Sequence, residues 1–178
     1  MQKIVLTFGL IAGAILSAMM LLTLPFMDKI GFDKGEVIGY TTMLLAFLMV
    51  YFGVRSYRDN VAGGSVAFGR AFLVGLSITL VASVCYVATW QVIYHNFAPD
   101  FYAKYAAYAA EKAKKSGVSA AQIAAEKKQM AEYIELYKNP LVNIGITLLE
   151  PLPVGLLFSL VTAGVLSRKR RVDVVPGA

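Results

Sequence analysis

Four stretches of the chain are long, apolar and almost free of charge. Residues 4–26, 37–54 and 71–94 contain no charged side chain, and residues 141–166 contain only Glu150. A transmembrane helix needs about 20 predominantly apolar residues, and all four stretches fall within or near that range. The pattern predicts four membrane-spanning helices, at about residues 4–26, 37–54, 69–95 and 141–167.

The first apolar stretch also shares one feature with a secretory signal, because Lys3 precedes it. A signal peptide has an apolar core of about 7–15 residues and then a small-residue cleavage site. Here the apolar run is 23 residues long and ends in Pro25-Phe26-Met27-Asp28. We therefore expect a retained helix that also serves as the insertion signal.

The segment of residues 99–140 departs from the membrane pattern, because it is polar, rich in alanine and helix-favouring. Ser116-Gly117 divides it, Ser119 and Gln122 have the spacing of a capping box, and Asn139-Pro140 ends the second half. Apolar side chains recur at helical spacing in both halves, at Phe97, Phe101, Tyr105 and Tyr108, and at Ile123, Met130, Ile134 and Tyr137. We predict an antiparallel helical hairpin on the non-cytoplasmic side. The first stripe is read as hairpin core or bilayer-surface contact in preference to a ligand platform.

The composition agrees with a membrane protein. Hydrophobic residues make up 58% of the 178 residues and charged residues 16%, against about 45–50% and 25% in average globular chains. The mean hydropathy is +0.63. The predicted fold class is therefore all-α: a polytopic bundle of four transmembrane helices, with the hairpin between the third and fourth.

The distribution of positive charge predicts the orientation. The N-terminus, residues 55–70 and residues 168–178 together carry 8 basic and 2 acidic residues, whereas residues 27–36 and 95–140 carry 9 and 8 over about twice the length. All six arginines lie in the first group. Because cytoplasmic loops are enriched in Lys and Arg, we expect both termini in the cytoplasm of a bacterial inner membrane. The chain then divides into residues 1–98 with three spans, the hairpin 99–140, the span 141–167 and a basic tail 168–178.

Small residues recur every fourth position in three of the four spans. The three stripes are Gly9, Gly13 and Ser17; Ala71, Gly75, Thr79 and Ser83; and Gly155, Ser159, Ala163 and Ser167. Small residues let helix backbones approach closely in lipid, where apolar side chains gain little from contact with one another. The stripes predict a compact bundle, and Gly9, Gly13, Gly75 and Gly155 are the expected packing positions, against a neighbouring helix or a second copy of the chain.

Glu150 is the acidic residue inside a span, about 13 Å from its beginning at a rise of about 1.5 Å per residue. Pro151 and Pro153 follow it, and their missing donors free the carbonyls of Thr147 and Leu149. A broken helix beside a carboxylate forms the cation or proton site of some transporters. The alternative is structural, with a neutral Glu150 donating to a freed carbonyl. We take Glu150, Pro151 and Pro153 as candidate functional residues.

Other candidate chemistry is sparse. Arg55, Arg58, Asp59 and Arg70 belong to a short basic cytoplasmic loop, where they are explained by topology and anionic lipid, with Asp59 pairing to Arg58 or Arg55. Gly63-Gly64 lacks the strand and the Gly-Lys-Ser/Thr of a phosphate loop. Tyr86, Trp90 and Tyr94 are read as an aromatic belt, and Cys85 and His95 as non-catalytic. We therefore expect no enzyme, no metal, no cofactor and no nucleic-acid partner.

Several short segments in a fixed order resemble a known bacterial family. They are Arg55-Ser56-Tyr57-Arg58-Asp59, Gly63-Gly64-Ser65-Val66-Ala67-Phe68-Gly69-Arg70-Ala71-Phe72, Pro99-Asp100-Phe101, Gly117-Val118-Ser119, Asn139-Pro140, Glu150-Pro151-Leu152-Pro153-Val154-Gly155 and Arg168-Lys169-Arg170-Arg171. They resemble the integral membrane proteins of domain-of-unknown-function family 4199, from about residue 9 to residue 171. The resemblance implies a four-helix inner-membrane protein with an outer helical hairpin and implies no reaction.

Two functions fit these observations. The first is a scaffold or accessory subunit that acts through its bundle or its hairpin, bound to the lipid bilayer and to a membrane-protein partner or a second copy. The alternative is a small oligomeric transporter of ions, protons or solutes that uses Glu150. Four spans are few for a self-sufficient transporter, so this alternative requires at least a dimer.

Overall fold

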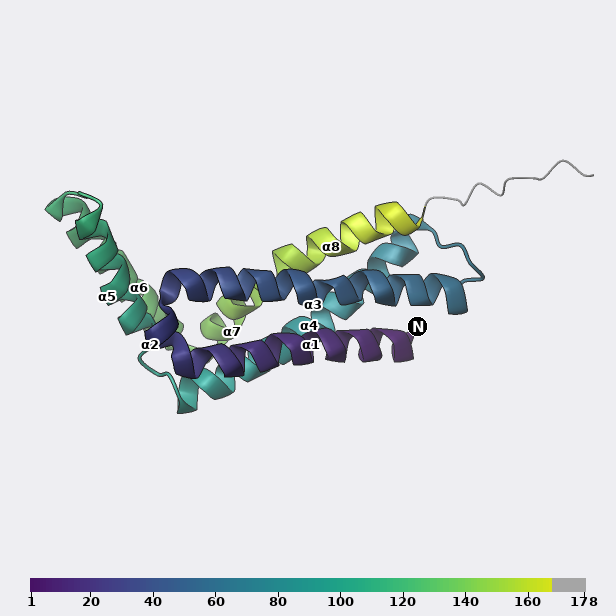
Figure 1. Cartoon of the computed structure of the whole chain (residues 1–178), viewed down its shortest axis with the longest axis horizontal. Coiled ribbons are helices and arrows are strands. Elements are labelled where there is room, and N and C mark those ends of the chain that lie inside the picture. The colour runs from purple at the N-terminus through teal and green to yellow at the C-terminus, as the bar shows by residue number, and fades with distance from the viewer. Residues whose placement is uncertain (168–178) are drawn as a thin grey trace, which may run out of the picture.

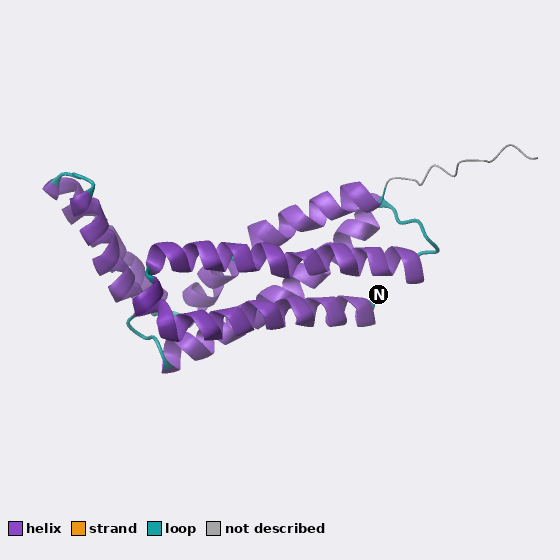
Figure 2. Ribbon diagram, viewed as in Figure 1, coloured by secondary structure: helices purple, strands orange, loops and turns teal. Residues whose placement is uncertain are grey.

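The computed structural model of the chain describes residues 1–167 and is helical throughout its regular structure. The elements are α1 (Gln2–Thr23), the 3₁₀ turn η1 (Leu24–Phe26), α2 (Met27–Ile30), α3 (Phe32–Asn60), α4 (Phe68–Asn96), α5 (Phe101–Lys115), α6 (Ala120–Tyr137), α7 (Pro140–Leu149) and α8 (Pro151–Leu166). Short loops join them (Figure 2). The predicted basic tail, residues 168–178, lies outside the described residues.

Four helical segments in this part of the chain are long and apolar enough to cross a membrane. They are Gln2–Ile30, Phe32–Asn60, Phe68–Asn96 and Pro140–Leu166, each 27 to 29 residues long. They lie side by side in a bundle, and the hairpin of α5 and α6 projects from one end (Figure 1). We call this end the hairpin end. The predicted fold class is confirmed.

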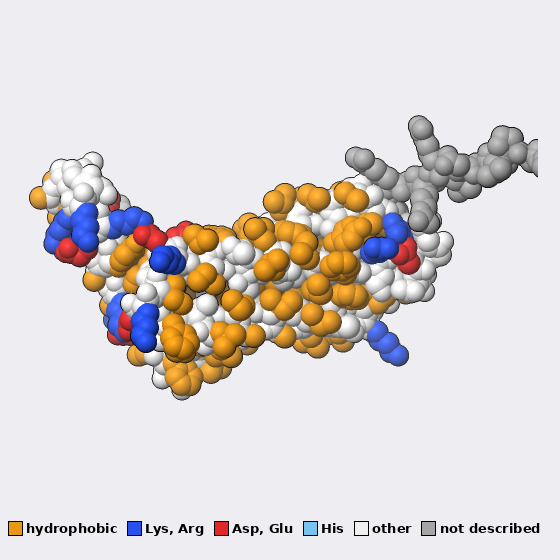
Figure 3. All heavy atoms as spheres, viewed as in Figure 1, with side chains coloured by type: hydrophobic (Ala, Val, Ile, Leu, Met, Phe, Trp, Pro, Cys, Tyr) orange, Lys and Arg blue, Asp and Glu red, His pale blue; other side chains and the backbone are white. Residues whose placement is uncertain are grey.

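Helix α4 lies at the centre of the bundle, in contact with α1, α3 and α8. The core around it is apolar, with Phe47, Val50, Val74 and Ile78 fully buried. The outer surface carries exposed leucines on all four spans, and the charged side chains gather at the two ends and on the hairpin (Figure 3). An apolar belt between polar ends is the surface that a bilayer covers.

Glycines line the closest approaches between helices. A Cβ on Gly9 would lie 2.6 Å from Val81 Cβ, and one on Gly13 would lie 2.6 Å from Cys85 Cβ, so α1 packs directly on α4. On the other side of α4, Gly75 faces Ser159 of α8, and Gly155 of α8 faces Thr79. These four glycines contact neighbouring helices of the same chain.

Hydrogen bonds between small polar residues reinforce the contact of α4 with α8. Thr79 Oγ1 donates to the Gly155 carbonyl at 3.2 Å and lies 3.3 Å from Ser159 Oγ, which itself donates to the same carbonyl at 2.8 Å. All three groups are buried. Interhelical bonds of this kind contribute about 0.6 kcal/mol on average in membranes. The close backbone approach that the glycines allow therefore also brings polar partners into reach.

The fourth span is interrupted at Glu150, where α7 ends and α8 begins. Pro151 and Pro153 have no backbone N–H to continue the ladder, which is why the helix breaks there. One part of the expectation is wrong: the Thr147 carbonyl is not left free, because it accepts from the Glu150 backbone N–H at 3.4 Å. A single tightened turn replaces the bond that Pro151 cannot make.

Candidate functional site

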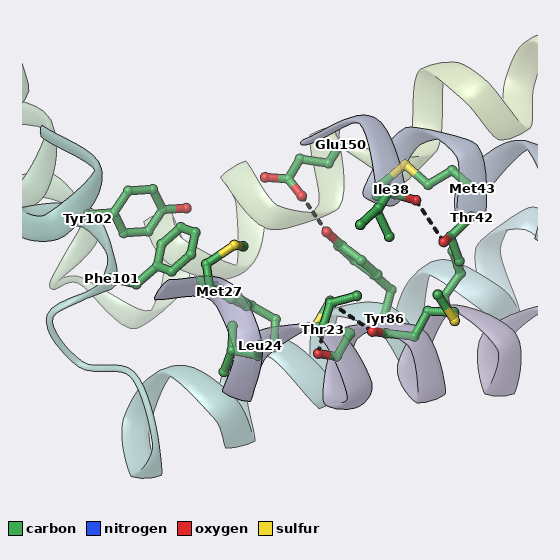
Figure 4. A pocket seen from close by; sticks show the side chains of 15 residues that line it. Thr23, Leu24, Met27, Ile38, Thr42, Met43, Tyr86, Phe101, Tyr102 and Glu150 are labelled. Atoms are coloured by element: carbon green, nitrogen blue, oxygen red, sulfur yellow. Dashed lines mark hydrogen bonds between the residues drawn. The ribbon is translucent and has the colours of Figure 1, made fainter. Parts of the chain in front are cut away.

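Glu150 meets a hydroxyl group of the central helix. Its Oε2 accepts a hydrogen bond from Tyr86 Oη of α4 at 2.6 Å (Figure 4). Among the described residues, the Glu150 side chain forms no hydrogen bond to a backbone carbonyl, so the donation expected from the sequence is not formed. The break between α7 and α8 thus presents a carboxylate to α4, with Oε1 left without a partner among the described residues.

The same carboxylate borders two adjoining cavities at the hairpin end. One has a volume of about 160 Å³ and the other about 320 Å³, and Met27, Gly39, Met43, Tyr86 and Glu150 line both. Helix α1 and its turn close one side, α3 another, and the start of α5 covers the end with Phe101 and Tyr102 (Figure 4). Glu150 is therefore placed at a site that a small ligand can fill.

A second polar cluster lies where the hairpin joins the bundle. Tyr137 at the end of α6 accepts a hydrogen bond from Trp90 Nε1 at 2.7 Å and lies 2.9 Å from Thr147 Oγ1. Asn143 Oδ1 accepts from Gln91 Nε2 at 2.6 Å and from Thr147 Oγ1 at 3.4 Å. The cluster links α4, α6 and α7, and Tyr137 is only 1% exposed.

Trp90 belongs to this buried cluster, so its assignment to an aromatic belt is wrong. It is 7% exposed, and its ring packs edge-on against Phe101 at a centroid distance of 5.1 Å. Tyr86, in the same proposed belt, is bonded to Glu150 instead. The belt pattern and a buried aromatic face look alike in sequence, because both require rings at helical spacing.

Aromatic rings form the seat on which the hairpin rests. Tyr102 packs on Trp90 and Tyr94 of α4 at 6.3 and 6.2 Å between ring centroids, and Tyr137 packs on Tyr94 at 5.4 Å. Phe97 was predicted in one stripe with Phe101, Tyr105 and Tyr108, but it is 73% exposed and does not belong to this seat. Its place in the sequence explains the difference, because it follows the end of α4 at Asn96 and precedes α5.

A second contact holds α5 against the start of α3. The ring of Phe32 packs on Phe101, Tyr105 and Tyr108 at centroid distances of 5.7, 5.4 and 5.2 Å. Next to it, Asp33 accepts hydrogen bonds from the Tyr108 hydroxyl and from Lys112 Nζ, the latter at 2.6 Å. The predicted stripe of Phe101, Tyr105 and Tyr108 thus packs against α3.

The pKa values of the hairpin's titratable groups reflect these contacts. Burial raises the pKa of Tyr102, Tyr133 and Tyr137, and the hydroxyl of each stays protonated as a donor or acceptor. The hydrogen bond to Asp33 raises the pKa of Lys112 and also that of Tyr108. At neutral pH these tyrosines are neutral and Lys112 is positively charged, in keeping with its contact with Asp33.

The predicted loop residues lie at the opposite end of the bundle from Glu150. Arg58 Nε is 2.7 Å from Asp59 Oδ1, and Arg55 Nε is 3.6 Å from Asp59 Oδ2. Arg70 lies in the first turn of α4 and is exposed. The loop and Glu150 are therefore separate features and cannot form one site.

The hairpin of α5 and α6, which projects from the bundle as an arm, has a small apolar core of its own. Within the arm, Ala110 and Ile123 are the buried apolar residues apart from Tyr137, and the predicted capping box of Ser119 and Gln122 is confirmed. Two short helices with so small a core bury too little surface to be stable alone. We expect an excised peptide of residues 99–139 to be mostly disordered by circular dichroism. A cooperative helical melt of that peptide would contradict this expectation.

Four packed apolar helices, a polar arm at one end and a carboxylate at an interior helix break define a polytopic helical membrane protein. Residues 7–168 match the family described as "Protein of unknown function (DUF4199)", and the chain belongs to this family. The match confirms the resemblance seen in the sequence. Among curated proteins and among solved structures, no match was found.

Proposed function

We propose that this protein is a non-enzymatic scaffold or accessory subunit that acts through its hairpin. The observation that carries this proposal is the way the arm is built. Its base is fixed by the buried Trp90–Tyr137 bond and by Phe32, whereas its far part extends beyond the bundle (Figure 1). A fixed, projecting, mixed-charge arm is suited to presenting a surface to another protein.

We further propose that the protein lies in a bacterial inner membrane with both termini in the cytoplasm. The described basic residues Lys3, Arg55, Arg58 and Arg70 lie at the end of the bundle opposite the hairpin. The positive-inside rule then directs the hairpin to the outer side. A partner would be a membrane protein with an outer domain, or a second copy of this chain.

A matched pair of variants tests the scaffold role. Lys127 and Lys128 are exposed on α6, so their joint replacement by glutamine changes the arm without touching its core. We expect affinity purification in mild detergent to recover a stoichiometric partner with the wild type and to lose most of it with Lys127→Gln/Lys128→Gln. The control Lys29→Gln/Lys34→Gln removes two exposed positive charges outside the hairpin and should retain the partner. A monodisperse monomer without a partner in several detergents would contradict the proposal.

A second candidate function is the transport of a proton or cation by an oligomer. It is favoured by one observation, the carboxylate of Glu150 held by Tyr86 beside a cavity at a helix break. Placing a charged side chain at this depth in a membrane costs at least about 2.5–3.5 kcal/mol. Residues that are kept at such a cost commonly have a function.

Reconstituted protein tests the transport role. We expect liposomes containing the wild type to show a proton or cation flux, and Glu150→Gln to abolish it, because the amide can neither carry a proton nor neutralise a cation. Glu132 is exposed on α6, far from any cavity that contains Glu150, so Glu132→Gln is the matched control and should leave the flux unchanged. Equal fluxes from the wild type and Glu150→Gln would exclude this function.

A further inference from the structure

The two cavities beside Glu150 are lined by acidic side chains and by no basic ones among the described residues. Glu150 lines both, and Glu36 lies at the wall of the larger one. Neither lining includes a Lys, Arg or His from the described residues. The Tyr86 hydroxyl is the group that bonds to Glu150, and it is neutral. Because the cavity linings place no cation beside the Glu150 carboxylate, a positively charged ligand would supply the missing partner.

Aromatic rings surround the same space. Tyr86, Phe101 and Tyr102 line both cavities, Trp90 lines the smaller and Tyr40 the larger. In Figure 4, Phe101 and Tyr102 approach from the hairpin side, opposite Tyr86 and Glu150. Ring faces attract ammonium groups, and indole does so most strongly. Rings and one carboxylate together form the recognition pattern for an organic cation.

The remaining wall is adaptable and offers few ligands to a metal. Met19, Met20, Met27 and Met43 contribute flexible thioethers that can fit irregular apolar groups. The nearby hydroxyls of Thr23 and Thr42 donate to their own helices, to Met19 and Ile38 carbonyls at 2.8 Å each. Hard metal ions need about six oxygen ligands, and no group of three His, Cys, Asp or Glu exists in residues 1–167 to supply them.

We propose that this cavity binds an organic cation, an amine or quaternary ammonium that carries apolar groups, with its charge beside Glu150 and its apolar part among the rings. The inference deepens the second candidate function, because it names the class of solute that the site would take. Binding is measured without transport, so a protein that binds but does not conduct retains this site and loses only the transport role.

Two ligands of the same shape test the proposal. Phenyltrimethylammonium carries one positive charge, and tert-butylbenzene is its neutral counterpart. Each would be dialysed to equilibrium against purified protein in detergent micelles, with empty micelles subtracted. We expect saturable binding of phenyltrimethylammonium, at least about tenfold tighter than that of tert-butylbenzene. Equal binding of the two would overturn the proposal and show an apolar niche of the kind that a lipid chain fills. No binding of the cation would also overturn it.

Two variants locate the site. Glu150→Gln should weaken binding of phenyltrimethylammonium by about tenfold or more, because the positive charge of the ligand loses its carboxylate partner. Gly39→Leu keeps the carboxylate but fills the space, because Gly39 lines both cavities and a Cβ there meets no atom within 4 Å. It should fold and also lose binding. The control Glu132→Gln should bind as the wild type does. Unchanged affinity in both Glu150→Gln and Gly39→Leu would place the ligand elsewhere and overturn the proposal.

Discussion

Replacing Gly155 with alanine is expected to destabilise the bundle more than any other single methyl group added to its glycines. The new Cβ would overlap Thr79 Cγ2 and lie 3.0 Å from Phe47 Cε1, in a fully buried interface. Thr79 cannot move away freely, because its hydroxyl donates to the carbonyl of Gly155 itself. Overpacking of a tight core costs typically about 1–3 kcal/mol. We expect a loss in the free energy of unfolding within that range.

Gly164 on the same helix provides the matched control. A Cβ there meets no atom within 4 Å, so Gly164→Ala adds the same methyl group without a clash. It should be neutral or slightly stabilising, because alanine is the better helix former by about 0.5–1 kcal/mol. Thermal unfolding of both variants in one detergent, followed by circular dichroism, gives the comparison. Equal melting temperatures would show that α4 and α8 are not held as closely as their small residues indicate.

The architecture could be predicted from the sequence because its signals are local. A charge-free run of about 20 residues specifies a span whatever its neighbours are, and the Ser119 to Gln122 spacing specifies a helix start. The glycine stripes also indicated close packing. Which helix each stripe faces could not be predicted, since it depends on how every helix is rotated about its own axis.

In the candidate site, too, the local feature could be predicted from the sequence and its spatial partners could not. Glu150 was identified from the sequence because a carboxylate in an apolar run is unusual. Its partner Tyr86 was not, because the two are 64 residues apart and Tyr86 also fitted a belt at the bilayer surface. The cavity also depends on the start of α5, which contributes Phe101 and Tyr102 to its wall. No periodicity within one segment reports such a juxtaposition.

The contacts of the hairpin base were missed for a different reason. Asn143 and Thr147, one turn apart on α7, are polar residues in an apolar run, and this spacing was the available signal. Phe32 gave no comparable signal in the sequence, because a single aromatic residue at the start of a span is common at a membrane interface. The hairpin base combines residues of five helices, α3 to α7, and its buried hydrogen bonds become visible only once these helices are placed together.

Tyr137→Phe is expected to loosen the hairpin from the bundle. The substitution removes one oxygen atom, which accepts from Trp90 Nε1 and bonds to Thr147, while the ring that packs on Tyr102 remains. The buried Trp90 N–H is then left without an acceptor, at a cost of about 1–3 kcal/mol. We expect a loss of stability in that range and faster hydrogen–deuterium exchange along α5 and α6 than in the wild type.

The control is Tyr105→Phe, which removes a hydroxyl from the same arm at a position 37% exposed and without a hydrogen bond among the described residues. It should leave exchange and melting unchanged. Because Trp90 is the single tryptophan of the chain, its fluorescence also reports the broken bond, and its emission should shift in Tyr137→Phe alone. Equal exchange in the two variants would mean that the aromatic packing of Phe32 and Tyr102 suffices to hold the arm, without the buried hydrogen bonds beneath it.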